Sequence, residues 1–313
     1  MENKVKVAIL GMHELGTDLL ERIQYAGKNL EVSAIVDFDS GLAYKTQSKE
    51  KELFITKNTD ELIQLPIFKE LKIIFDTTSN ELALLNEKRI REIHSDIYYI
   101  STSWSGKEPF VPAINKNIDI SKKSYNIITP SAQVSIPIIK SVSQIGKVHY
   151  AEVVTGISSL VADKESRLNI DDIILKTSQG IESLGGASKG RSILILNPAE
   201  PPILNRNTIY ILSEKLSLSE IEKNIKEMIE NVKVYLPGYR LKQNIQLDEI
   251  YEDSPIQIPG LGLFSGLKIG IFLEVEAFSK SLPPYSGNLD ILASVAKTLG
   301  ERIAENINHS IKK

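Results

Sequence analysis

The sequence predicts an α/β protein built from two domains. In roughly the first 130 residues, short apolar runs alternate with helix-like segments, a pattern typical of a parallel sheet with helices on both faces. From about Lys147 onward, long segments alternate apolar and polar residues, which favours a mostly antiparallel sheet with one covered face. The chain has 313 residues, of which 42% are hydrophobic, so it has enough apolar material for two domains or one large one.

The elements of the first domain follow from runs rich in Val and Ile and from helical spacing of apolar residues. Each strand-like run ends in a glycine or in acidic and hydroxyl residues. We expect strands at Lys4–Leu10, Glu31–Val36, Leu71–Phe75 and Asp96–Ile100, and helices at Thr17–Tyr25, Thr59–Leu65 and Glu81–His94.

The second domain has longer strands, and a final helix is expected to return to the first domain. We therefore place the first domain at residues 1–130 with about 289–313, and the second at 131–288. We expect strands at His149–Ser159, Ser192–Leu196, Thr208–Leu212, Asn244–Ile250 and Lys268–Phe278, and helices at Ile170–Ser183, Ser219–Val232 and Leu289–Ile311.

Composition excludes several classes of function. The net charge is -3 and the only basic block is Lys312-Lys313, so neither nucleic acid nor an anionic membrane is an expected partner. There is no signal-peptide-like start and no apolar run of spanning length, and we expect a cytoplasmic protein. The chain has no cysteine, which excludes disulfides, thiolate metal sites and thiol nucleophiles. Its four histidines lack metal-ligand spacing, so no metal site is expected.

A glycine-containing loop follows the first predicted strand. Dinucleotide-binding Rossmann domains carry G-x-G-x-x-G there, and Gly11 and Gly16 fill the first and third positions. The first glycine permits the tight turn and the third lets helix and strand pack closely. His13 occupies the second position, so its imidazole must point away from a bound pyrophosphate or hydrogen-bond to it. The alternative is that both glycines merely turn a strand into a helix, because a lone fingerprint is a weak signal.

Polar residues at two further strand ends support nucleotide binding. Asp37 and Asp39 end the second strand, close to where an acidic residue binds the ribose 2′-hydroxyl. A carboxylate there would repel a 2′-phosphate, which favours NAD over NADP. Thr77 and Thr78, after the third strand, are further candidates for contact with the cofactor.

Motifs along nearly the whole chain resemble acylating acetaldehyde dehydrogenase. They occur in the family's order with few gaps. The matching segments are Gly16–Leu19, Phe75–Ser79, Lys147–Glu152, Asn169–Asp171, Gly185–Gly190, Ile195–Pro202, Pro237–Gln243, Phe264–Lys268 and Gly287–Ile291.

The resemblance implies a Rossmann domain followed by an α+β domain that dimerises. It also implies a reaction in which a cysteine adds to acetaldehyde, hydride passes to NAD, and coenzyme A takes up the acyl group. Family members usually partner a 4-hydroxy-2-oxovalerate aldolase, which passes them the aldehyde.

The family's catalytic cysteine is missing from this chain. The family's T-C-G-G-Q stretch reads here as Thr129-Pro130-Ser131-Ala132-Gln133, so Pro130 stands at the cysteine position. Proline suits the first turn of a helix, and the exchange is therefore structurally comfortable and chemically silent. The family's glycine-rich S-A-G-P-G-T-R run is also replaced, by residues 161–167. Together with His13, this makes three altered ligand-facing loops.

Three polar residues are candidates for substrate contact. Ser131 as a covalent nucleophile lacks a predicted general base, and a local helix hydrogen bond is the stronger interpretation. His149 lies in a strand and fits a packed core position better than a catalytic one. Gln133 and Asn288 match family positions; Asn288 is a candidate amide partner for nicotinamide or substrate, or else a turn residue bonded to its own backbone.

Two functions remain open. The first is an NAD-dependent oxidoreductase that reduces or forms a small carbonyl or imine by direct hydride transfer, without a cysteine thioester. The second is a non-catalytic partner of an aldolase-like enzyme that keeps the fold and the assembly surfaces. We favour the first because the strand ends at Asp37 and Asp76–Ser79 are still typical of nucleotide sites. In both cases we expect a homodimer.

Overall fold

The computed structural model describes residues 4–38, 53–103, 108–162, 167–258 and 260–311. The chain forms two compact units. Unit 1 comprises residues 1–128 and 292–313, and unit 2 comprises residues 129–291. The boundary near the C-terminus falls inside helix α8 (Gly287–Ile311), whose first turn belongs to unit 2.

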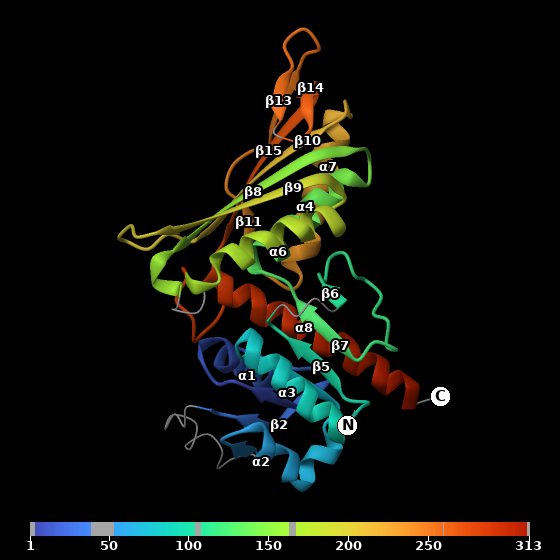
Figure 1. Cartoon of the computed structure of the whole chain (residues 1–313), viewed down its shortest axis with the longest axis vertical. Coiled ribbons are helices and arrows are strands. Elements are labelled where there is room, and N and C mark those ends of the chain that lie inside the picture. Colours follow the sequence, from blue (N-terminus) through green and yellow to red (C-terminus); the bar gives the residue numbers. More distant parts are fainter. Residues whose placement is uncertain (1–3, 39–52, 104–107, 163–166, 259, 312–313) are drawn as a thin grey trace. The chain divides into compact units, whose positions relative to one another are not determined.

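Unit 1 contains a seven-stranded sheet in the order β3-β2-β1-β4-β5-β7-β6, and all of its paired strands are parallel (Figure 1). This confirms the predicted parallel Rossmann-like sheet. The strands are β1 (Val5–Leu10), β2 (Leu30–Val36), β3 (Phe54–Thr56), β4 (Ile73–Asp76), β5 (Tyr98–Ser101), β6 (Glu108–Phe110) and β7 (Ser124–Ile127).

Helices cover both faces of this sheet. On β4, Ile74 packs in one buried cluster with Leu62 and Ile90. Phe75 points to the opposite face, where a Cβ added to Gly300 of α8 would lie 2.4 Å from its ring. The other helices of unit 1 are α1 (Glu14–Ala26), α2 (Thr59–Gln64), α3 (Asn80–Ile93) and the 3₁₀ helix η2 (Pro66–Glu70).

The last helix is fixed to unit 1 by polar contacts as well as by packing. The Glu301 carboxylate accepts hydrogen bonds from the backbone N–H groups of Lys28 and Asn29, at 2.8 and 2.9 Å. The Arg302 guanidinium donates to the carbonyl of Asn115 at 2.8 Å. These contacts hold the later turns of α8 on unit 1.

Unit 2 contains a mixed six-stranded sheet. Its order is β11-β15-β10-β8-β9, and β12 pairs with a second stretch of β15. Only β8 and β9 run parallel, because helix α6 crosses over between them; the other described pairs are antiparallel. The strands are β8 (Val148–Ser158), β9 (Ala187–Asn197), β10 (Asn205–Ser213), β11 (Tyr239–Leu241), β12 (Gln246–Ile250) and β15 (Gly266–Val275).

One face of this sheet is covered and the other is open. Ile209 and Ile211 of β10 are fully buried, whereas Thr208 and Tyr210, which alternate with them, stay partly exposed. The buried face is the one that meets the helices. Tyr239 of β11 pairs with Val275, as Asn205 of β10 does, so it lies on the same face as Ile209 and Ile211. Its hydroxyl donates to the carbonyl of Val134 in α4. The helices are α4 (Pro130–Ser143), α6 (Ile170–Ser183) and α7 (Leu218–Lys233), with the 3₁₀ turn η3 (Ser159–Val161).

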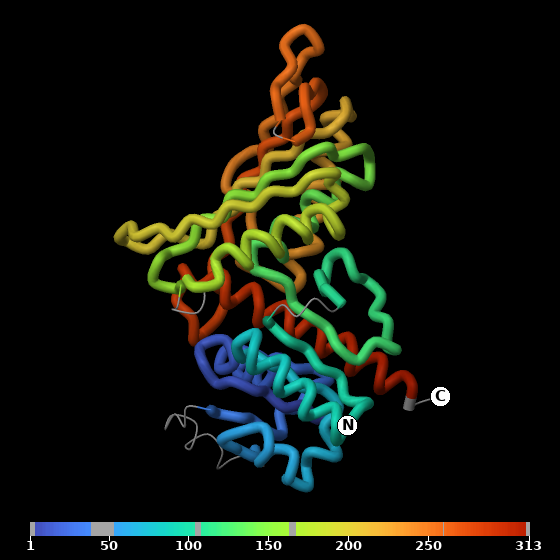
Figure 2. Tube along the Cα trace, viewed as in Figure 1, coloured from blue at the N-terminus to red at the C-terminus, as the bar shows by residue number. Residues whose placement is uncertain are grey.

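A small hairpin lies beyond β12. Strands β13 (Ile256–Ile258) and β14 (Gly262–Phe264) pair only with each other, as a two-stranded sheet. Figure 2 shows the hairpin leaving the main sheet of unit 2 as an orange arm. No helix in the described ranges has the length and apolar character needed to cross a membrane.

Candidate functional site

The turn between β1 and α1 has the geometry expected of a nucleotide loop. Gly11 adopts φ +88°, a region that other residues rarely enter. A Cβ added to Gly16 would lie 1.9 Å from the carbonyl oxygen of Gly11, so only glycine lets α1 start this close to β1. His13 is the exposed N-cap residue of α1 and its side chain makes no capping hydrogen bond. The N-terminus of α1, a position that attracts anions, therefore carries the imidazole of His13 where the fingerprint has its second glycine.

The turn after β4 buttresses this loop. The hydroxyl of Thr77 lies 2.9 Å from the carbonyl oxygen of Leu10 and 2.8 Å from that of Gly11. The hydroxyl of Thr78 donates to the carboxylate of Asp76 at 2.5 Å. The Thr77 hydroxyl thus joins the two turns, whereas the Thr78 hydroxyl is bonded within its own turn. We expect any contact with a cofactor to come from other atoms of this turn.

Asp37 lies directly after β2, at the same edge of the sheet. It is 7% exposed, and its backbone N–H donates to the carbonyl oxygen of Thr56 at 2.9 Å. Its position therefore agrees with that of a ribose-binding carboxylate. Asp39, the other acidic candidate, lies outside the described residues.

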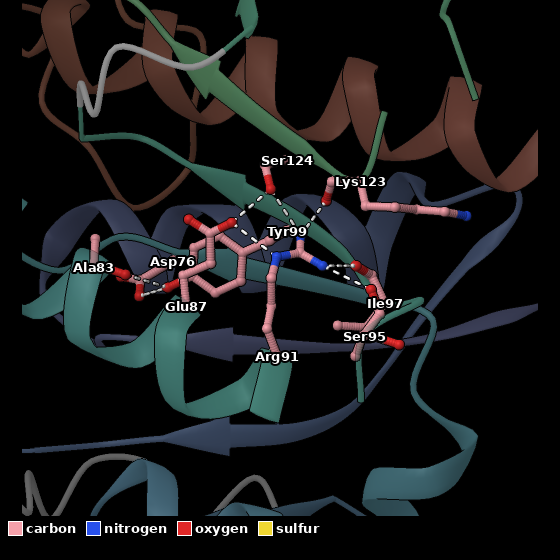
Figure 3. Close-up of polar contacts among 9 residues, drawn as sticks. All are labelled: Asp76, Ala83, Glu87, Arg91, Ser95, Ile97, Tyr99, Lys123 and Ser124. Atoms are coloured by element: carbon pink, nitrogen blue, oxygen red, sulfur yellow. Dashed lines mark hydrogen bonds and ion pairs between the residues drawn. The ribbon is translucent and has the colours of Figure 1, made fainter. Parts of the chain in front are cut away.

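A buried hydrogen-bond network surrounds Asp76, the last residue of β4 (Figure 3). Its carboxylate accepts bonds from the Thr78 backbone N–H at 2.8 Å, from the Asn86 amide at 2.9 Å, and from the Tyr99 hydroxyl. Thr59 of α2 extends the network, because its hydroxyl donates to the Asn86 carboxamide oxygen at 2.7 Å. The network joins α2, α3, β4 and β5 behind the nucleotide turn.

Burial dominates the electrostatics of this network. Asp76 is fully buried, and desolvation raises the pKa of its carboxyl group, against the opposing effect of the hydrogen bonds from Thr78, Tyr99 and Asn86. Burial also raises the pKa of the Tyr99 hydroxyl well above its usual value, and the neighbouring Asp76 carboxylate adds to this shift. The Tyr99 hydroxyl therefore remains a hydrogen-bond donor at physiological pH.

A second network adjoins the first one in Figure 3. The Glu87 carboxylate accepts from Arg91 at 3.0 Å and from the Ser124 hydroxyl at 2.5 Å. The Arg91 guanidinium also donates to the carbonyl oxygens of Lys123 and Ser95, at 2.7 and 2.9 Å. Sequence analysis flagged the strand end at Asp76 but found neither network, because their members lie on several elements that are far apart in the sequence. Within the described ranges, no three His, Cys, Asp or Glu side chains gather as metal ligands would.

In unit 2, the stretch expected at the family's cysteine position, Thr129–Gln133, forms the start of α4. Pro130 is the first residue of the helix, and the Thr129 side chain caps it by accepting from the Ala132 backbone N–H at 3.2 Å. The hydroxyls of Thr129 and Thr177 lie 2.6 Å apart, which ties this turn to α6. Pro130 presents no nucleophile, and its fixed φ angle suits the position.

The candidate substrate residues of this helix are buried. Ser131 and Gln133 are 5% and 1% exposed. No hydrogen bond between Ser131 and a histidine exists among the described residues. The ring of His149 instead packs against Phe264, with centroids 5.5 Å apart, as expected for a structural histidine.

Asn288, in the first turn of α8, is different. Its carboxamide oxygen is buried and has no hydrogen-bond partner in the part of the chain that the structure describes. This argues against the alternative in which Asn288 is a turn residue whose carboxamide oxygen bonds to its own backbone. An unsatisfied buried acceptor is costly, so the oxygen is poised to accept from a ligand N–H or O–H group.

Beside Asn288 lies a buried polar chain that sequence analysis did not identify. The Thr155 hydroxyl donates to the Asn207 carboxamide oxygen at 2.7 Å, and the Asn207 amide donates to that of Asn205 at 2.6 Å. A Cβ added to Gly287 would lie 3.0 Å from the Cβ of Asn205, so the chain borders the turn that carries Asn288. Alternating polar residues in a strand gave no signal to distinguish this face from a solvent-exposed one.

Comparison with known proteins agrees with the two-unit architecture. Residues 130–283 match the family described as prokaryotic acetaldehyde dehydrogenase, dimerisation. An aspartate semialdehyde dehydrogenase II from Vibrio cholerae shares the fold, with a TM-score of 0.61 at 10% identity, over 97% of this chain and 98% of that one.

Full-length relatives share much more of the sequence. The acetaldehyde dehydrogenase of Cupriavidus pinatubonensis is 42% identical over 96% of this chain and 97% of its own length. Those of a Pseudomonas species and of Escherichia coli are 40% and 39% identical, over 98% and 97% of this chain and 99% and 97% of their own lengths. The resemblance seen in the motifs is thereby confirmed: the chain belongs to the acylating acetaldehyde dehydrogenase family, as a member without any cysteine.

Proposed function

We propose that the protein is an NAD-dependent oxidoreductase that acts on a small carbonyl or imine compound by direct hydride transfer, without a cysteine thioester. The observation that carries this proposal is a contrast between the two units. The nucleotide turn of unit 1 keeps its close glycine packing, while unit 2 has Pro130 where the family's nucleophile stands.

The residues of unit 1 fit a dinucleotide. Gly16 packs so closely on Gly11 that α1 starts directly at the end of β1, and Asp37 follows the neighbouring strand β2. The loop at Gly11, His13 and Gly16 would hold the pyrophosphate, Asp37 the adenosine ribose, and the turn at Thr77 and Thr78 the adjoining part of the cofactor. When bound, the nicotinamide would supply or accept the hydride.

The proposed substrate contacts belong to unit 2. Ser131 supplies a hydroxyl group, and Gln133 and Asn288 supply carboxamides, which can hold a carbonyl oxygen or an imine nitrogen. The buried Asn288 oxygen can accept from an N–H or O–H group of the substrate or of the nicotinamide. None of the three groups is a nucleophile activated by a base, which agrees with chemistry that forms no covalent intermediate.

Calorimetric titration with NAD, NADH, NADP and NADPH tests the cofactor proposal. We expect binding of NAD(H) and much weaker binding of NADP(H), because the Asp37 carboxylate would repel a 2′-phosphate. Asp37→Ser should narrow this preference, whereas Glu31→Gln, an exposed acidic residue at the other end of β2, should leave it unchanged. Equal affinity of the unaltered protein for both cofactors would show that the ribose site is misassigned.

The second candidate is a non-catalytic partner of an aldolase-like enzyme. The segments Ile195–Pro202 and Pro237–Gln243, among those that resemble the family, lie within the matched dimerisation region and not in the nucleotide loops. Assembly surfaces retained beside altered ligand loops favour this alternative. Absence of binding for all four nucleotides, together with co-elution with a co-expressed aldolase, would support it over the oxidoreductase.

We also propose a homodimer formed through the open face of the unit 2 sheet. Partly exposed side chains on this face include Val154, Thr208, Tyr210 and Phe272, and they lie in register on adjacent strands. A face of this kind resembles half of a sheet-on-sheet interface. Light scattering behind a sizing column should give about twice the monomer mass of 34.9 kDa. A constant monomer mass over a wide concentration range would refute the dimer.

A further inference from the structure

We propose that the β13–β14 hairpin is a dimerisation arm that packs against a second copy of this chain. The arm is defined here as residues Ile256–Ile258 and Gly262–Phe264. This inference rests on the proposed homodimer and assigns it a second contact beyond the open sheet face.

One side of the arm is anchored on its own sheet. Ile258 and Phe264 are 4% and 7% exposed and form a buried cluster with Leu212 of β10. Tyr150 and Ile250, also from the main sheet, pack against this cluster. In the β8–β10 register, Leu212 and Tyr150 are partners that follow Tyr210 and Glu152 along the open face. The arm therefore covers one end of the open face. The next cross-strand pairs along that face, Tyr210 with Glu152 and Thr208 with Val154, stay uncovered.

The other side of the arm is exposed and carries an apolar side chain, Leu263, next to the polar Gln257. Leu263 precedes Phe264 in β14, so the two side chains point in opposite directions, and Leu263 is 71% exposed. Gln257, the partner of Leu263 in the β13–β14 register, shares this side and is exposed, and Leu261 in the turn is 43% exposed. Ile256 pairs with Phe264 and therefore lies on the anchored side. A two-stranded hairpin is marginally stable by itself and presents unpaired strand edges. A hairpin that projects leucines away from its own sheet is therefore incomplete in the single chain.

A second copy fits as the covering partner for two reasons. The arm lies within residues 130–283, the segment that matches the family described as dimerisation. It also borders the open face, and Leu263 points away from the sheet on which Phe264 packs. A second copy that covers the open rows must approach from that side, and its surface would meet Leu263.

The charges of the open face do not oppose such a contact. Glu274 pairs with Arg206 and Arg240, at 3.2 and 3.0 Å, and Glu152 lies 3.6 Å from Arg191. These carboxylates are already matched within one chain, and a second copy would not have to supply their counter-charges.

The absence of cysteine makes a direct test simple, because an introduced cysteine is the only thiol in the chain. Leu263→Cys, labelled with a fluorophore sensitive to polarity, should shift to shorter wavelength as the protein concentration rises through the monomer–dimer transition. Leu218→Cys is the matched control: Leu218 is 51% exposed on α7, which packs on the other face of the sheet, and its label should not respond.

A charge at the same position gives an independent measurement. Leu263→Asp should raise the dimer dissociation constant about tenfold or more, since it replaces an apolar contact by a carboxylate, whereas Leu218→Asp should not change it. If light scattering shows dimers while the label at position 263 does not respond and Leu263→Asp dimerises normally, the arm proposal is wrong and the dimer stands. If the protein is monomeric at all concentrations, both are wrong.

Discussion

Removing the Tyr99 hydroxyl tests whether the Asp76 network stabilises the sheet edge that carries the nucleotide turn. The Tyr99 side chain is 1% exposed, and its hydroxyl donates to the Asp76 carboxylate while lying 3.0 Å from the Ala83 carbonyl oxygen. Tyr99→Phe keeps the ring and creates no large cavity, so the change isolates the hydrogen bond. A hydrogen bond to a charged or partly charged group contributes about 1.5–3 kcal/mol, and we expect that loss in the free energy of unfolding.

Tyr98→Phe is the matched control for this change. Tyr98 precedes Tyr99 in β5, and its hydroxyl donates to the carbonyl oxygen of Ile120 at 2.9 Å, a bond between neutral groups. Its loss should cost about 0.5–1.5 kcal/mol. Urea denaturation followed by circular dichroism, with unchanged m-values, measures both. Equal costs, or a smaller cost for Tyr99→Phe, would refute the reasoning that the buried carboxylate makes this bond the stronger one.

Three further outcomes follow from the same geometry. Gly16→Ala should lower the stability of unit 1 by at least about 1–3 kcal/mol and weaken NAD binding in calorimetry, because the new Cβ would lie 1.9 Å from the Gly11 carbonyl oxygen; an unchanged melting temperature contradicts this. Burial raises the pKa of Asp76, so its contribution to stability is complete below the unfolded value of about 3.9 and decreases as pH rises through the folded value. The unaltered protein should therefore lose its advantage in free energy of unfolding over Asp76→Asn as pH rises. An advantage that grows with pH would show that the pKa of Asp76 is lowered in the folded protein. Pro130→Cys should change stability by no more than about 1 kcal/mol and should not create coenzyme A-dependent acetaldehyde oxidation, because the neighbouring glycines and a third loop also differ; a rate near that of ordinary family members would show that only the thiol is missing.

The regular elements of the fold were predictable from the sequence. Ile170–Ser183 was predicted with the bounds of α6, and α1, α3, α7 and α8 were predicted within a few residues, because their apolar positions repeat over several turns. For α4 only a helix start near Pro130 was expected, and no range was predicted. The short strands β3, β6, β7, β11, β13 and β14 were not predicted. Three or four residues carry no periodic signal, and tertiary pairing decides whether they form strands.

Strand ends in unit 2 were also misjudged. The prediction Ser192–Leu196 covered less than half of β9 (Ala187–Asn197), since the first half of the strand consists of small and charged residues, which gave no strand signal although they pair with β8. The predicted strand Lys268–Phe278 ends at Val275, where the backbone N–H of Glu276 donates to the carbonyl of Gly238. A mostly antiparallel sheet was correct except for the β8–β9 pair, whose crossover helix was predicted without its topological consequence.

The candidate site was predicted in part. The roles of Gly11 and Gly16 in turn and packing follow from one sequence motif, and the structure shows the same close approach. The buried networks at Asp76 and at Asn207 depend on residues far apart in sequence, and a single sequence contains no measure of their proximity. The binding roles of Ser131, Gln133 and Asn288 stay predictions that ligand titration can test.

The most direct test of the central claim combines two measurements on the same incubations. The protein is incubated with NAD and acetaldehyde, or with NADH and a panel of small carbonyl compounds. Absorbance of NADH follows hydride transfer, and intact-protein mass spectrometry detects any covalent adduct. The account predicts nucleotide-dependent turnover of at least one carbonyl or imine substrate, no dependence on coenzyme A, and a protein mass that stays unmodified throughout. An acyl adduct on the protein, or turnover that requires coenzyme A, would contradict it.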